Sequence, residues 1–153
     1  MNRARLFLAL ALAACTPGGA AAIGGGGGAN VTTIDVNLTL SQPVSTPYGQ
    51  SGGMTPPITT VAVGSQIQFT NTDGFAHTAS LLPGSPKTFP SGSPLTGAAT
   101  TLFGTTISTP NWTSGAMQAG ASSQVITVDK PGTYLYGCFF HFAAPMKGAI
   151  VAQ

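Results

Sequence analysis

The sequence predicts an all-β fold, either a sandwich or a barrel, from three observations. Apolar and polar residues alternate with a period of two in several short segments after residue 30, and Gly, Pro and Ser separate these segments. No window of a dozen residues in this part shows the period of an amphipathic helix. The chain of 153 residues is long enough for one domain and too short for two of ordinary size. Many short strands with frequent turns favour packed sheets or a closed barrel.

The first expected strand covers residues 31–40, whose alternate apolar side chains would share one face of a sheet. These side chains are Ile34, Val36, Leu38 and Leu40. A loop rich in Pro, Gly and Ser follows at residues 41–57. Residues 61–71 are expected to form two short strands or one bent strand, because a Gly-Ser pair interrupts their apolar pattern.

The second half of the chain contains three further expected strands. Residues 82–97 are rich in turn formers and are expected to be a loop, and residues 98–117 alternate too poorly for an assignment. Clear alternation returns at residues 125–128, followed by a turn at 129–132 and a strand that enters Cys138. The last strand is expected at residues 148–152.

The first fourteen residues have the layout of a bacterial export signal. Arg3 and Arg5 precede an apolar run from Leu6 to Ala14, which is much shorter than the roughly 20 residues that span a bilayer. The run ends in Leu-Ala-Ala-Cys15, which resembles the lipobox of bacterial lipoproteins, in which the cysteine is acylated. The alternative is an ordinary cleaved signal with Cys15 discarded or left as an idle thiol. In both cases we expect an exported protein, on the periplasmic side or the outer surface of a bacterial membrane.

The residues after Cys15 are rich in Gly and Ala and lack both charge and periodicity. Such a stretch behaves as a flexible tether. The expected organisation is therefore a signal peptide at 1–14, a lipidated Cys15 with its tether at 15–30, and one folded domain at 31–153.

Charge excludes several functions. After the signal, three Lys balance three Asp, so nucleic acid is not an expected partner, because its phosphates require a basic patch. Glu is absent and the three Asp are scattered, which argues against a carboxylate pair for acid/base catalysis. We therefore do not expect an enzyme.

Cys138, His141 and Met146 lie close together in a chain with only two Cys and two His. Singly, each has an ordinary interpretation: an inert buried Cys, a histidine at an edge, and a Met that fills the core. Their spacing instead favours a loop after a strand, on which a thiolate, an imidazole and a thioether converge. These ligands suit copper in both oxidation states. Cys138 would also have no disulfide partner once Cys15 is removed or acylated.

A trigonal copper site needs a second imidazole, and the only other one is His77, in the segment that follows residues 61–71. Two imidazoles, a thiolate and an axial Met are the blue-copper ligand set. Zinc could use the same residues, but structural zinc prefers four strong ligands and a thioether is a weak one.

The segment 131–151 resembles the cupredoxins, and among them the plastocyanin-like group. It follows the family pattern of Gly, x, Tyr, x, aromatic, x, Cys, x, x, His, four residues, Met, x, Gly and an apolar strand. These positions are Gly132, Tyr134, Tyr136, Cys138, His141, Met146 and Gly148. Residues 61–78 resemble the strand and the first-ligand loop of the family, through Val63, Gly64, Ile67, Phe69, Asn71 and His77.

This resemblance implies an eight-stranded Greek-key β-sandwich with one type 1 copper at one end. The implied ligands are His77, Cys138, His141 and Met146, and the implied function is electron transport by a carrier that cycles between Cu(I) and Cu(II). No histidine remains for the additional coppers of oxidases and nitrite reductases.

Two residues are expected to support the ligands, Asn71 and Thr78. Plastocyanins have Pro-His-Asn where this chain has Ala-His-Thr. The hydrogen bond that the family's Asn makes between the ligand loops must therefore come from the Thr78 hydroxyl or be lost.

The apolar ligand loop is expected to form the docking patch for a redox protein, such as a cytochrome or an oxidase. The patch residues would be Phe139, Phe140, Phe142 and Pro145, with the alternative that some of the three Phe point inward as core. Plastocyanins have a Tyr before the Cys, beside a remote acidic patch, whereas this chain has Gly137 and no acidic cluster. We expect a monomer with brief, weakly salt-dependent docking.

Two other functions remain open at this stage. A copper-handover protein of the same fold could use Met54 and Met117 as spare soft ligands and would lose copper readily to a chelator. A metal-free adhesion sandwich would leave the ligand spacing as a coincidence.

Overall fold

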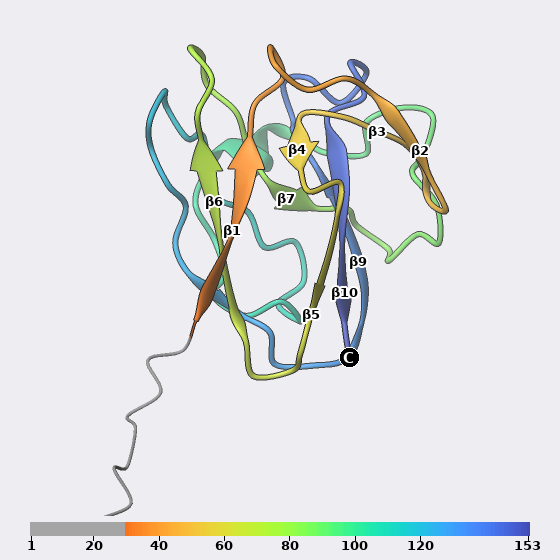
Figure 1. Cartoon of the computed structure of the whole chain (residues 1–153), viewed down its shortest axis with the longest axis vertical. Helices are drawn as coiled ribbons and strands as arrows, with labels where there is room; N and C mark the ends of the chain where they lie inside the picture. Colours follow the sequence, from red (N-terminus) through yellow and green to blue (C-terminus); the bar gives the residue numbers. More distant parts are fainter. Residues whose placement is uncertain (1–29) are drawn as a thin grey trace, which may run out of the picture.

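The computed structural model describes residues 30–153, which form two four-stranded sheets and a small hairpin (Figure 1). The first sheet has the order β4 (Met54–Thr55), β1 (Val31–Val36), β6 (Gln66–Asn71) and β8 (Ile126–Thr127). The second has the order β5 (Ile58–Val61), β10 (Lys147–Ala152), β9 (Gly132–Gly137) and β7 (Ser80–Leu81). The hairpin pairs β2 (Val44–Thr46) with β3 (Gly49–Ser51). The predicted all-β sandwich is confirmed.

The core lies between the two sheets and follows the predicted alternation. In β6, Ile67 and Phe69 are fully buried, and in β10 Ile150 is fully buried from the opposite sheet. The Phe69 ring stacks on Trp112 at 5.9 Å and meets the edge of Tyr136 at 5.1 Å. Burial of such large side chains stabilises a fold by about 1.5–3 kcal/mol each, so this cluster fixes how the sheets pack.

The register of β9 and β10 places Cys138 at one end of the sandwich. These antiparallel strands pair Gly137 with Lys147 at that end and Gly132 with Ala152 at the other. Cys138 therefore follows β9 at the end of the sheet away from the C-terminus, which Figure 1 marks. Among the described residues, no helix has the length and apolar character that crossing a membrane requires.

The first strand is shorter than predicted. β1 ends at Val36, residues 38–40 form a turn, and Leu40 is 81% exposed instead of lying on the buried face. The carboxylate of Asp73 accepts the N–H groups of Leu38 and Thr39 at 2.9 and 3.1 Å, so these groups leave the strand ladder.

The segments between the predicted strands also differ in part. The expected loop 41–57 contains β2, β3 and β4, which are too short to show a period of two. In the segment 61–71, β5 ends at Val61, a turn follows, and β6 begins at Gln66. Of the two predicted alternatives, two strands or one bent strand, the first is confirmed. Residues 98–117, for which no assignment could be made from the sequence, include most of a 3₁₀ turn, η1 (Gly97–Thr100). Their other pairings are isolated β-bridges, such as the one between Met117 and His77. The predicted signal, Cys15 and most of the tether lie outside the described residues.

Candidate metal centre

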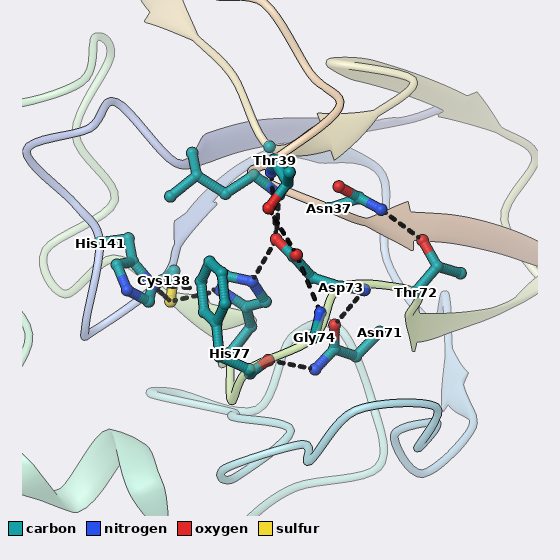
Figure 2. A network of polar contacts seen from close by, with 12 residues as sticks. Asn37, Thr39, Asn71, Thr72, Asp73, Gly74, His77, Cys138 and His141 are labelled. Carbon is teal, nitrogen blue, oxygen red and sulfur yellow. Dashed lines mark hydrogen bonds and ion pairs between the residues drawn. The ribbon is translucent and has the colours of Figure 1, made fainter.

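Three side chains from two distant loops converge after β6 and β9. His77 and Cys138 are fully buried and His141 is half-buried. Cys138 Sγ lies 3.7 Å from Nδ1 of each histidine, and the two Nδ1 atoms are 3.1 Å apart (Figure 2). Within residues 30–153 this is the one group of three or more His, Cys, Asp or Glu side chains arranged to hold a metal ion.

The loop that carries His77 is held by Asn71 at the end of β6. The Asn71 side-chain amide donates to the carbonyl oxygens of Phe75 at 2.8 Å and Met117 at 2.9 Å. Its side-chain oxygen accepts the N–H of Asp73 at 2.9 Å. The main chain of His77 also pairs with Met117 in both directions, at 3.1 and 2.8 Å. Asn71 therefore fixes the loop from which the His77 ring projects.

Thr78 joins the two ligand loops, as the sequence allowed. The Phe139 N–H donates to the Thr78 hydroxyl at 2.9 Å, and the Thr78 N–H donates to Cys138 Sγ at 3.4 Å. Each of these hydrogen bonds joins residues about sixty positions apart in the sequence. The hydroxyl thus supplies the link between loops, and the backbone donor stabilises negative charge on the sulfur.

The second ligand loop is closed by its own backbone. The Cys138 N–H donates to the carbonyl of Met146 at 3.0 Å, and the Met146 N–H donates to the carbonyl of His141 at 3.2 Å. Met146 itself is fully buried in the same core cluster as Cys138. The first and last residues of the loop are therefore adjacent.

Gly53 borders the Met146 side chain from the β3–β4 connection. A Cβ added to Gly53 would lie 2.7 Å from Met146 Cγ and 3.3 Å from Sδ, and Gly53 has a φ of 69°. A larger residue at this position is therefore disfavoured both by the backbone conformation and by the thioether.

The donor set fits a type 1 copper. A point between Cys138 Sγ and the two Nδ1 atoms lies about 2 Å from each, close to metal bonds of roughly 2.0–2.3 Å to imidazole and thiolate. A thiolate, two imidazoles and a buried thioether from Met146 are the ligand types of a blue-copper site. These residues would hold one copper ion, which supplies a one-electron couple when bound.

Burial and neighbouring groups shift the pKa values of His141 and Asp73. Burial lowers the pKa of His141, the neighbouring His77 lowers it further, and Asp73 opposes this change. Burial alone would raise the pKa of Asp73, but hydrogen bonds from Thr39, Gly74 and His77 outweigh it and hold that pKa well below its usual range. His141 therefore favours the neutral imidazole and Asp73 the carboxylate.

An exposed aromatic ring, Phe75, covers the two histidines and was not singled out from the sequence. Phe75 is 44% exposed, and its ring centroid lies 4.8 Å from that of His77 and 5.2 Å from that of His141. Its position two residues before His77 was the only signal in the sequence. Phe75 separates both imidazoles from solvent on this side.

The expected docking patch is only partly at the surface. Phe140 is 45% exposed, and Phe139 and Pro145 are half-buried. Phe142 is buried, with its ring beneath the Lys147 ammonium at 4.3 Å, so its assignment to the patch was wrong. The reason is Gly137, because a Cβ at that position would lie 2.8 Å from the Phe142 ring. The glycine before Cys138 therefore makes room for an inward-facing Phe142.

Asp73 also escaped the sequence analysis, although it is one of only three Asp and lies four residues before His77. Its Oδ2 is 3.1 Å from His77 Nε2, on the side of the ring away from Cys138 (Figure 2). A carboxylate that holds the second nitrogen of a metal-binding histidine is a common arrangement in metal sites.

Comparison with known proteins places this fold and site in a family. The family model of copper-binding proteins of the plastocyanin/azurin family matches residues 48–153. A purple cupredoxin from Nitrosopumilus maritimus aligns with 17% identity and a TM-score of 0.50, over 80% of this chain and 99% of that one. An oxidised amicyanin variant aligns with 18% identity and a TM-score of 0.43, over 63% of this chain and 70% of that one. No curated protein sequence matches the chain.

Proposed function

The chain belongs to the plastocyanin/azurin family of copper-binding proteins, and from this we propose that it is an electron carrier that cycles one type 1 copper between Cu(I) and Cu(II). The observation that carries the proposal is the convergence of Cys138 Sγ and both Nδ1 atoms within bonding reach of one point. The β-sandwich holds these ligands from two distant segments, so neither oxidation state can rearrange them far. A rigid site lowers the reorganisation that accompanies gain or loss of an electron.

Electrons would enter and leave through His141. This ring is half-buried, and it lies beside the exposed rings of Phe75 and Phe140, with centroids 5.2 and 6.2 Å away. An apolar surface around the ligand suits brief contact with a redox protein, such as a cytochrome or an oxidase. A monomer could perform this role, and electron transfer of this kind would need no catalytic side chains.

Copper handover without redox turnover is less well supported. That function relied on Met54 and Met117 as spare ligands, and both side chains lie in the core, 1% and 3% exposed. They therefore offer no sulfur at the surface for passing a metal ion onward. Retention of copper through repeated redox cycles in the presence of a chelator would distinguish the carrier from a handover protein.

The test of the site is a titration with Cu(II), followed by visible absorption and electron paramagnetic resonance, beside Cys138→Ser. We expect an intense thiolate-to-copper band and narrow copper hyperfine splitting at one equivalent, bleached by reductant and absent from the variant. A weakly coloured product with broad splitting in the unsubstituted protein would contradict the proposed function.

Export and lipid attachment at Cys15 complete the proposal. An acylated Cys15 would keep the carrier at a membrane surface while the residues up to 30 let the domain reorient. Mass spectrometry of the protein from a bacterial membrane fraction should show diacylglycerol on Cys15. A mature chain that begins elsewhere would contradict lipidation.

A further inference from the structure

Asp73 is a buried carboxylate in direct contact with a ligand ring. It is 7% exposed, and its Oδ2 lies 3.1 Å from His77 Nε2 (Figure 2). The opposite ring nitrogen, Nδ1, faces Cys138 Sγ at 3.7 Å. His77 therefore lies between the carboxylate and the metal-binding point.

The carboxylate is surrounded by donors. Oδ2 accepts the N–H groups of Leu38 and Thr39 at 2.9 and 3.1 Å as well as contacting His77. Oδ1 accepts the Thr39 hydroxyl at 2.7 Å and the Gly74 N–H at 2.9 Å. A carboxyl group that only accepts hydrogen bonds is held in its ionised form. The turn after β1 and the loop after β6 are thereby joined through one negative charge.

This arrangement decides which nitrogen of His77 carries the proton. An ionised carboxylate can only accept, so in the neutral imidazole of His77 Nε2 is the donor and Nδ1 presents the lone pair. The two Nδ1 atoms lie 3.1 Å apart, and in this tautomer His77 can only accept at that contact. The lone pair on Nδ1 points toward Cys138 before any metal arrives.

The charge of Asp73 has no cationic partner when His77 is the neutral imidazole. Within the described part of the chain, the His77 ring is the one basic group within ion-pair distance of a carboxylate, and no Lys approaches Asp73 that closely. A Cys138 thiolate and Asp73 together contribute two negative charges to a buried site. These charges balance Cu(II) fully and leave one negative charge in excess over Cu(I), which is costly in a low-dielectric interior.

We propose that Asp73 positions His77 for copper and that its charge favours Cu(II), so that it lowers the reduction potential of the site. The proposal rests on the proposed function, since it concerns the same copper couple. It is a positioning and charge-balancing role for a residue that does not itself contact the metal-binding point.

The charge is tested by the reduction potential of Asp73→Asn, which keeps the size and an acceptor oxygen. The matched control is Asp35→Asn, because Asp35 lies in β1, beside the strand that precedes Asp73, and accepts one hydroxyl, from Thr72 at 2.6 Å, without touching a ligand. We expect Asp73→Asn to weaken the preference for Cu(II) over Cu(I) by at least about tenfold, a rise of about 59 mV for a one-electron couple. Asp35→Asn should shift the potential much less. Equal shifts in the two variants would overturn the charge-balancing role.

The positioning role is tested in the copper-free protein by nitrogen NMR of ¹⁵N-labelled histidine. We expect His77 to carry its proton on Nε2, and Asp73→Ala to admit the other tautomer and to lose about 10–100-fold in copper affinity. A proton on Nδ1 of His77 in the unsubstituted protein would overturn this role, whether or not the variant folds. If the unsubstituted protein shows no reversible copper couple, the proposed function and the charge-balancing role fail together, whereas the tautomer still decides the positioning role.

Discussion

At the scale of single residues, the contact between Gly53 and Met146 limits where the thioether can lie. Gly53 has no side chain, its φ is 69°, and the Met146 Cγ would lie 2.7 Å from an added Cβ. Met146 cannot retreat, because it is fully buried. A methyl group at residue 53 must therefore move the thioether or distort the backbone.

Gly53→Ala is expected to change both stability and the copper spectrum. The matched control is Gly84→Ala, which has a similar φ of 74° and nothing within 4 Å of the added Cβ. Unfolding by urea should show that Gly53→Ala loses about 1–3 kcal/mol more than the control, the usual cost of overpacking. The hyperfine splitting should change in Gly53→Ala alone. Equal losses with unchanged spectra would mean that the thioether is not confined by Gly53.

At the scale of elements, the site depends on two loops that meet through Thr78. The first loop follows β6 and the second follows β9, and the Phe139 N–H reaches the Thr78 hydroxyl at 2.9 Å across 61 residues of sequence. Without that acceptor, the Phe139 N–H next to Cys138 would lose its partner. A buried donor left without a partner costs about 1–3 kcal/mol.

Thr78→Val should destabilise the copper-free protein by about that amount. Thr59→Val is the matched control, because the Thr59 hydroxyl is buried and has no hydrogen-bond partner. The same substitution there should leave the free energy of unfolding unchanged or raise it. Urea unfolding of both variants provides the measurement, and a stable Thr78→Val with an unaltered copper spectrum would show that this bond does not couple the loops.

At the scale of the whole molecule, we expect docking to depend on apolar surface, because the charges of the folded domain cancel. Residues 30–153 contain three Lys and three Asp, whose charges cancel. The exposed rings beside His141 belong to Phe75 and Phe140. Encounters at this end should therefore depend little on salt.

Electron self-exchange between copies of the protein, measured by NMR line broadening in partly oxidised samples, provides the test. We expect little change with ionic strength, and exchange at least about tenfold slower in Phe140→Asp, equal to about 1.4 kcal/mol. Val63→Asp is the control: Val63 is 44% exposed and its N–H bonds the carbonyl of Gln153, at the end of the sandwich away from Cys138. Similar slowing in both variants would place electron exchange elsewhere.

The parts of the fold that could be predicted are those that local patterns report. Alternation in residues 66–71 shows which side chains face inward, and the apolar run at 148–152 marks a strand that is buried along nearly its whole length; these patterns are sufficient for an all-β fold. The end of β1 could not be predicted in this way, because Leu38 and Leu40 continue the alternation. Their strand ends because Asp73, more than thirty residues away, takes the N–H groups of Leu38 and Thr39.

The sequence by itself determined the sandwich and the choice of Cys138, His141, Met146 and His77 as candidate ligands, because Cys and His are so scarce that few combinations exist. Only the tertiary structure decided what surrounds these ligands. The carboxylate behind His77, the aromatic cover of Phe75 and the burial of Phe142 depend on how ligand loops and side chains pack in space. Composition and periodicity report which face of an element is apolar, whereas hydrogen bonds and packing depend on which elements the fold brings within a few ångströms of each other.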